Sequence, residues 1–204
     1  MKLPIIAMLE LQDAMNSKVH PQWREQGNAW YRAIWVECAE LLDHYGWKWW
    51  KAQQPDMEQV ELEVIDIWHF GLSIELESGD DNAVIAERLS KTLSKRADEG
   101  LRETVESFAE KTLSTKGFDV EGFAKVMNAA GLSFDQLFER YVAKNVLNLF
   151  RQDHGYKEGT YIKVWNGKED NEHLMEILAL IDITQAGVKD TLYSELKGRY
   201  QAIA

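Results

Sequence analysis

The chain has 204 residues, of which 45% are hydrophobic and 28% are charged, a composition typical of a globular rather than a disordered protein. Its formal net charge of -11 at pH 7 argues against nucleic acid as a partner, because backbone binding needs a basic face. The only cysteine, Cys38, excludes an internal disulfide and is consistent with a reducing cytoplasm, where we expect the protein. No signal peptide is recognisable, and no stretch approaches the ~20 apolar residues of a membrane span.

The apolar residues of the first part of the chain recur at helical spacing. Met8, Leu11 and Met15 predict one face of a first helix. A second helix is predicted over residues 21–44 and a third over residues 56–77, with the turn between them rich in tryptophan.

The remaining sequence continues this pattern. Two or three helices are predicted within residues 83–130, with Asp80 or Asp81 as a cap, and a long helix from Ser133 to about residue 153. Helices resume near residue 172 and again near residue 188. We therefore expect an all-α fold, with residues 1–204 forming a single domain.

One segment departs from the helical pattern. Residues 153–171, "DHGYKEGTYIKVWNGKEDN", are rich in glycine, lysine and aromatic residues and show no helical period. Long loops inside compact domains are often functional, so we predict a functional loop here.

Two acidic pairs carry the strongest chemical signal. Glu37 and Glu40 lie three residues apart on the second predicted helix, and Glu63 and Asp66 on the third. Residues at this spacing lie side by side on a helix surface. If the two helices are antiparallel, the pairs can meet around one cavity, and carboxylates in such a cavity suit Mg²⁺.

The pairs also have a simpler interpretation. Acidic residues three apart are common on solvated helix surfaces, where they contribute little. Two pairs on consecutive helices, both within apolar sequence, are equally well explained as a metal or catalytic site. Spacing alone leaves both interpretations open.

Three segments go further than the pairs, because they resemble the successive signatures of a known family. They are "ECAELLDHYGWKWWK" (residues 37–51), "ELEVIDIWHF" (residues 61–70) and "KNVLNLFRQDHGYKEGTYIKVWNGKEDN" (residues 144–171). Together they are similar to the dimeric all-α dUTPases, relatives of the MazG-type nucleotide pyrophosphohydrolases. The resemblance is weakest over residues 83–132.

This resemblance implies an enzyme that hydrolyses dUTP, and dUDP as well, to dUMP, which keeps uracil out of DNA. It implies a homodimer whose acidic site lies between two antiparallel helices and holds two or more Mg²⁺ ions. Glu37, Glu40, Glu63 and Asp66 match the metal ligands, and Glu40 is also expected to orient or deprotonate the attacking water.

The resemblance also implies two groups of substrate-binding residues. Residues at positions i, i+4 and i+7 share one helix face, and three such residues together with the loop residues match the phosphate-binding set: Lys144, Asn148, Arg151, Tyr156, Lys157, Lys163 and Asn171. Arginine can hold phosphate oxygens in a bidentate manner. The loop is expected to close over the phosphates.

The second group would bind the nucleoside. Gln12 and Asn16 match the amides that read uracil, and an amide carries both a donor and an acceptor. Trp49 and Phe70 match aromatic residues that line the nucleoside pocket. Without the resemblance, the two amides would count as ordinary polar surface.

Three alternatives remain open. A pyrophosphohydrolase of the MazG type acting on another nucleotide would keep the acidic residues and change the base pocket. A di-iron oxidase is weakened because Asp66 and His69 form one carboxylate-histidine half-site, whereas neither Glu37 nor Glu40 is followed by histidine at the third position. A non-enzymatic helical dimer would use its acidic helices for partner binding only.

Overall fold

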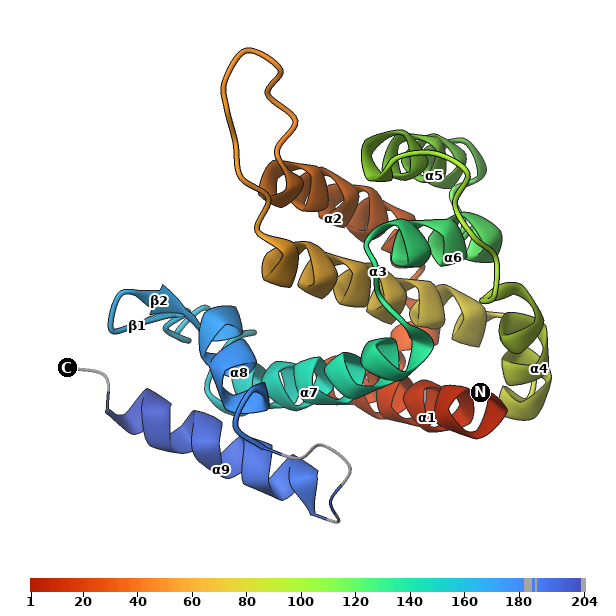
Figure 1. Cartoon of the computed structure of the whole chain (residues 1–204). Helices are drawn as coiled ribbons and strands as arrows, with labels where there is room; N and C mark the ends of the chain where they lie inside the picture. The colour runs from red at the N-terminus through yellow and green to blue at the C-terminus, as the bar shows by residue number, and fades with distance from the viewer. Residues whose placement is uncertain (182–184, 186, 203–204) are drawn as a thin grey trace. The chain divides into compact units, whose positions relative to one another are not determined.

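A computed structural model of the protein describes residues 1–181, 185 and 187–202. The described residues form the helices α1 (Lys2–Val19), α2 (Trp30–Tyr45), α3 (Met57–Glu77), α4 (Asn82–Thr92), α5 (Leu101–Thr115), α6 (Val120–Ala129), α7 (Phe134–Asp153), α8 (Asp170–Leu178) and α9 (Val188–Gln201), the short 3-10 helix η1 (Trp23–Glu25), and the strands β1 (Val164–Trp165) and β2 (Lys168–Glu169). The predicted all-α class is confirmed (Figure 1).

The chain divides into two compact units, residues 1–138 and residues 139–204, and the boundary falls within α7. The prediction of a single domain stays a prediction.

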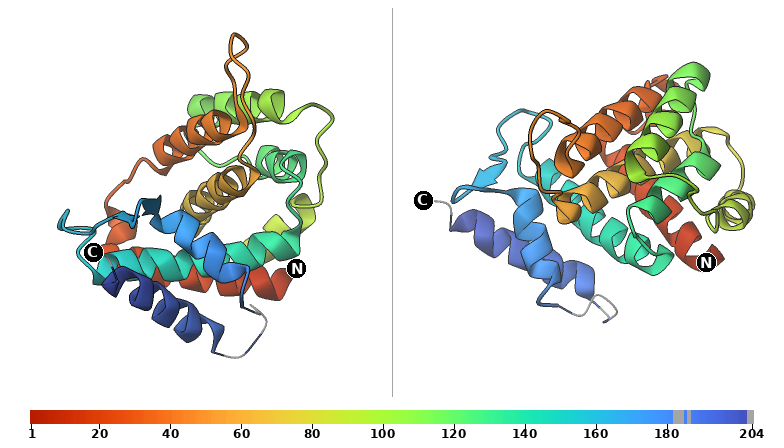
Figure 2. Two further views of the ribbon diagram at one scale, coloured as in Figure 1. Left: turned by 60° about the vertical axis from the view of Figure 1, so that its left-hand side comes forward. Right: turned by 45° about the horizontal axis from the view of Figure 1, so that its top comes forward.

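The first unit is built around α2 and α3, which run antiparallel and side by side (Figure 1). α5 packs on α2, α6 on α5, and α1 on both α3 and α4. The loop between α2 and α3, residues 46–56, projects beyond the ends of both helices in Figure 1 and in the left view of Figure 2. The predicted antiparallel pair is therefore confirmed, with the tryptophan-rich segment at its turn.

The buried face of α1 differs from the predicted one. Ile5, Met8 and Leu9 are buried there, and so are the polar residues Gln12 and Asn16 on the same stripe. Leu11 and Met15 are only half-buried. The two amides thus belong to the interior of the first unit rather than to its surface.

The predicted start of the second helix, near residue 21, is wrong. The chain instead forms η1, turns at Gly27, which has a φ of +61°, and enters α2 only at Trp30. A positive φ is easy for glycine and interrupts a right-handed helix. The helical spacing of apolar residues from Trp23 to Trp30 therefore continues across a break in the helix at Gly27.

Other boundaries agree with the sequence. The Asp81 side chain, not that of Asp80, caps α4 by accepting from the Ala83 backbone N–H at 2.8 Å. Ser133 and Gln136 satisfy each other's backbone N–H groups at the start of α7, at 3.3 and 3.0 Å. Such hydrogen bonds can be predicted from the sequence because they join residues that are close together in the chain.

The second unit has an aromatic core of its own. Phe150, Trp165, Leu174 and Leu196 are buried in one cluster, and Tyr161 packs against it. The predicted loop contains the two-stranded hairpin β1–β2, whose turn is made by Asn166 and Gly167 at φ values of 49° and 86°. Two consecutive positive φ values suit a tight hairpin turn.

Among the described residues, none of the helices combines the length and apolar character that a bilayer crossing requires.

Candidate active site

Three of the four predicted metal ligands form one cluster. Glu37 of α2 and Glu63 and Asp66 of α3 each offer a carboxylate oxygen, and these oxygens lie within 4.8 Å of one another. Glu37 lies three residues after Ile34 and four before Leu41, so it shares the face that α2 buries against its neighbours. Glu63 is only 4% exposed. Helical periodicity therefore carries these carboxylates into the contact between α2 and α3.

The cluster is electrostatically unfavourable without a cation. Burial, followed by the charges of Asp66 and Glu63, raises the pKa of Glu37 to about 9. Like charges at this separation resist simultaneous ionisation. Hard oxygen donors that repel one another fit a divalent cation, which would allow all three to ionise.

Glu40 lies outside this cluster. It is exposed and lines a groove of about 620 Å³ with Trp35, Val36 and Trp47 of the α2 side and Arg102 of α5. Residues three apart on a helix differ by ~60° in direction, which is enough to turn Glu40 toward α5. Glu40 nonetheless raises the pKa of Glu37 through its charge.

His44 is a neighbour of the cluster that spacing did not single out. Its Nε2 lies 3.4 Å from Glu63 Oε1. From the sequence, His44 was expected only to lie near the end of the second predicted helix.

The two predicted uracil-reading amides belong to a buried polar network between α1 and α3. Gln12 Nε2 donates to Asn16 Oδ1 at 3.0 Å and to Ser73 Oγ at 3.1 Å, and Asn16 Nδ2 donates to Ser73 Oγ at 2.9 Å. His69 Nδ1 lies 2.7 Å from Gln12 Oε1. The structure therefore brings Gln12 and Asn16, which lie one helical turn apart on α1, together in one network.

The two predicted aromatic residues have different neighbours. Trp49 is 90% exposed in the loop after α2 and makes an edge contact with Trp50 at 5.4 Å between ring centroids. Phe70 is half-buried on α3 and stacks on Trp30 at 6.2 Å. Trp47 and Trp50 in the same segment are also exposed.

The predicted phosphate-binding residues converge in the second unit on one hydrogen-bonded network. Arg151 donates through Nε and Nη2 to the two carboxylate oxygens of Asp170, both at 2.8 Å. Arg151 Nη2 also donates to Asn171 Oδ1 at 3.3 Å, and Nη1 to Asn148 Oδ1 at 3.3 Å. Lys144 is buried and donates from Nζ to the same Asn171 oxygen at 2.9 Å.

Burial favours a raised pKa for Asp170, but the hydrogen bonds and charge of Arg151 outweigh it and lower the pKa below the ordinary value. The Tyr161 hydroxyl also donates to Asp170, at 2.8 Å. The wholly buried carboxylate is thus fully compensated by its neighbours.

The remaining loop residues are more exposed. The Tyr156 ring lies 5.7 Å from the Arg151 guanidinium carbon. Lys163 Nζ pairs with Glu169 at 2.8 Å, and Lys157 is exposed. Of the predicted loop set, Asn171 therefore belongs to the Arg151 network and Tyr156 lies beside Arg151, whereas Lys163 pairs with Glu169.

Asp170 and Ser73 are the structural partners that sequence reasoning missed. Asp170 stands directly before Asn171 in the "EDN" segment, so its position was a usable signal. Ser73 had none, because a single serine on a helix carries no pattern of its own.

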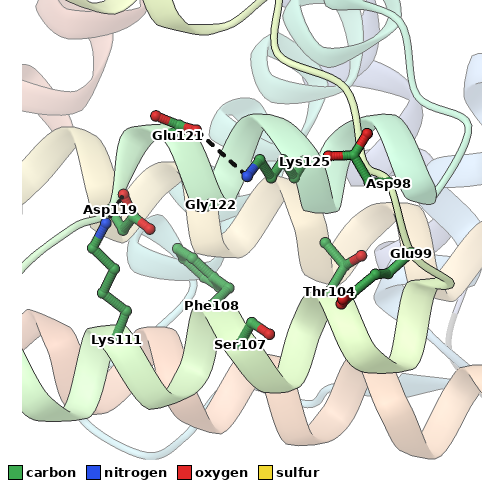
Figure 3. Close-up of a pocket in the computed structure, with 10 residues that line it drawn as sticks. All are labelled: Asp98, Glu99, Thr104, Ser107, Phe108, Lys111, Asp119, Glu121, Gly122 and Lys125. Carbon is green, nitrogen blue, oxygen red and sulfur yellow. Dashed lines mark ion pairs between the residues drawn. The ribbon is translucent and has the colours of Figure 1, made fainter.

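A separate cavity of about 410 Å³ lies between α5 and α6 (Figure 3). Its lysines are paired with acidic residues that also line it: Lys111 Nζ lies 3.1 Å from Asp119 and Lys125 Nζ lies 3.4 Å from Glu121. None of the predicted site residues lines it.

An all-α protein with clustered carboxylates on two antiparallel helices belongs to the class of helical proteins with a site able to hold a metal ion. A family model described as dUTPase matches residues 4–156. The chain therefore belongs to the all-α dUTPase family, whose members are dUTP diphosphatases, and the predicted family and enzyme class are confirmed. No curated protein matches the chain.

Proposed function

We propose that the protein hydrolyses dUTP, and also dUDP, to dUMP in a Mg²⁺-dependent reaction that releases pyrophosphate or phosphate. Family membership supports dUTP hydrolysis. The observation that carries the metal dependence is the cluster of Glu37, Glu63 and Asp66, whose mutual repulsion a divalent cation would relieve.

Glu37, Glu63 and Asp66 would hold the metal, with Glu40 completing the set from the edge of the cluster. When bound, Mg²⁺ supplies charge stabilisation for the phosphate oxygens and the leaving group. Glu40 is exposed and so accessible to solvent, which suits its proposed role of orienting or deprotonating the attacking water.

The phosphates would be held by Lys144, Asn148, Arg151 and Asn171, which already share one network. Each cationic group in that network is also hydrogen-bonded within the protein, so its direction is set before substrate arrives. Tyr156, Lys157 and Lys163 would contribute from the loop over residues 153–171.

The base would be bound at the network that contains the amides of Gln12 and Asn16, and the nucleoside by Trp49 and Phe70. Stacking on an aromatic ring contributes ~1–3 kcal/mol per base. We further propose a cytoplasmic homodimer, in which exposed tryptophans such as Trp49 and Trp50 are covered by substrate or by the second subunit.

The test is release of phosphate and pyrophosphate from a panel of deoxynucleotides and ribonucleotides, with Mg²⁺ and with a chelator. We expect selective turnover of dUTP and dUDP that stops on chelation and in Glu40→Gln. Glu58→Gln, the same conservative change at an exposed position of α3 outside the cluster, is the matched control and should retain activity. Activity that survives chelation would contradict the metal site.

The alternative is a MazG-type pyrophosphohydrolase acting on another nucleoside triphosphate. The acidic cluster is equally compatible with it, because the cluster acts on phosphates and not on the base. The same panel separates the two, since turnover of another nucleotide in preference to dUTP would keep the metal site and discard the uracil pocket.

A further inference from the structure

The hydrogen-bond network between α1 and α3 is closed off from solvent on nearly every side. Gln12, Asn16, His69 and Ser73 are all buried, and Ser73 is 0% exposed. Buried polar groups are expected to be paired, and each pairing here limits which atom of an amide can face which neighbour.

Ser73 determines the direction of both amides. Its hydroxyl donates to the backbone oxygen of His69 at 3.0 Å, and a carbonyl can only accept. The hydroxyl oxygen therefore acts as an acceptor toward Gln12 and Asn16, at 3.1 and 2.9 Å, and both amides must turn their NH₂ groups to it.

Gln12 fixes the other end of Asn16. Gln12 Nε2 donates its second hydrogen to Asn16 Oδ1 at 3.0 Å. If the Asn16 amide turned over, two NH₂ groups would face each other there, and the Ser73 hydroxyl would have to abandon the His69 carbonyl. One orientation of Asn16 is thus favoured at both of its polar atoms.

The side-chain nitrogen and oxygen of Gln12 are both hydrogen-bonded within the network. Both hydrogens of its nitrogen are used within the network, and its oxygen accepts from His69 Nδ1 at 2.7 Å, which assigns the Nδ1–H form to this histidine. Gln12 is therefore a positioning residue.

Asn16 retains unused capacity. Its side chain is 7% exposed, and its side-chain partners among the described residues are Gln12 and Ser73. One hydrogen on Nδ2 and one lone pair on Oδ1 remain. A donor and an acceptor in fixed order complement the N3–H and C4 carbonyl of uracil, whereas cytosine presents an acceptor at N3 and an amino donor at C4, the reverse order.

We infer that Ser73 is a specificity-determining residue: it holds the Asn16 amide in the orientation that accepts uracil and rejects cytosine. This inference rests on the proposed function, because it requires the base to meet Asn16. It assigns direct contact with the base to Asn16 and a positioning role to Gln12, His69 and Ser73.

Ser73→Ala tests the inference, because it removes the acceptor that both amides face. The measured quantities are the rate of dUTP hydrolysis and the competitive inhibition constants of dUMP and dCMP, which can be determined whether or not a cytosine nucleotide is hydrolysed. A matched control is Ser90→Ala in α4, since Ser90 also donates to a backbone oxygen, that of Glu87, at 3.0 Å and has no amide partner in the network.

In Ser73→Ala we expect the preference for dUMP over dCMP to fall by about 5- to 150-fold, the range of one good bidentate base contact. In Ser90→Ala the preference should equal that of the parent. If both inhibition constants weaken by the same factor in Ser73→Ala, Ser73 is merely structural and the inference is wrong.

Asn16→Asp is a second variant that does not depend on the folding of Ser73→Ala. A carboxylate cannot donate to the uracil carbonyl but can accept from the cytosine amino group. The preference should therefore shift toward dCMP, and an unchanged preference would overturn the inference. If the parent fails to hydrolyse dUTP at all, the proposed function fails instead, so the two failures are distinguishable.

Discussion

The carboxylates of the first unit and the carboxylate of the second unit are buried in opposite ways. Glu37 lies against Glu63 and Asp66, and burial together with these like charges raises its pKa to about 9. Asp170 is buried more deeply, yet its two oxygens accept from Arg151 and Tyr161, and its pKa is lowered in spite of burial.

This difference distinguishes a candidate binding site, the cluster of Glu37, from a structural ion pair, that of Asp170. A buried carboxylate with a bidentate arginine is already compensated, and removing either partner leaves an uncompensated charge. In a cluster of like charges, the compensating positive charge has to come from a bound cation. The first arrangement holds side chains in place, and we propose that the second binds a metal ion.

The largest effect should come from breaking the acidic cluster. Glu63→Gln removes a charged oxygen from the most buried of the three carboxylates and should lower kcat/KM for dUTP by roughly 10²–10⁴-fold, since a catalytic metal contributes several kcal/mol to the barrier. Steady-state kinetics over a Mg²⁺ series would show this. Recovery of full activity at high Mg²⁺ would indicate weakened metal affinity alone, and parental activity at every Mg²⁺ concentration would contradict the site.

Breaking the compensated pair should act on stability. Asp170→Ala leaves Arg151 and Tyr161 without their shared acceptor and should cost about 3–5 kcal/mol in the free energy of unfolding. Urea denaturation of the parent and the variant measures it. Glu195→Ala, at an exposed position of α9, is the control and should cost less than ~1 kcal/mol.

A third prediction uses the sign of the Glu37 shift. The pKa of Glu37 in the folded state, about 9, lies above the ordinary value of 4.5. At pH values between the two, Glu37 therefore keeps a proton in the folded state that it has lost in the unfolded state. Stability of the metal-free protein should therefore fall as the pH rises through this window. Denaturation in chelator at pH 5.5, 7 and 8.5 should show a steeper decline for the parent than for Glu37→Gln. Equal slopes would refute the clustered arrangement, and added Mg²⁺ should flatten the parental slope.

The smallest effect on stability is expected at the exposed pair Lys163–Glu169. Lys163→Met should change the free energy of unfolding by less than ~1 kcal/mol, because exposed ion pairs contribute little. If Lys163 closes over the phosphates as proposed, KM for dUTP should rise while the melting temperature stays constant. An unchanged KM would limit phosphate binding to the network of Arg151.

Much of the fold was predictable because it depends on local rules. The helical spacing of apolar residues, the caps at Asp81 and Ser133, and the end of α2 at Gly46 all involve neighbours within one or two turns. The break at Gly27 was missed because apolar spacing continued through it, and a positive φ leaves no mark on periodicity.

The candidate site was predictable only in part. The family segments identified the acidic residues, and the pairing of Gln12 with Asn16 follows from their being one turn apart. Ser73 was missed because its importance comes from partners 57 and 61 residues away along the chain. Such distant pairings have no local signature.

The sequence by itself determined the helical class, the family, and the residue types that bear the chemistry, since these follow from periodicity and from side-chain identity. Tertiary structure alone decided that Glu37 meets Glu63 and Asp66 while Glu40 turns toward a groove shared with α5. It also decided that Gln12 donates both of its side-chain N–H hydrogens within the network, whereas Asn16 has one N–H hydrogen that is not used there. The physical reason is that helix spacing fixes which residues share a face, whereas packing against other helices fixes what that face meets.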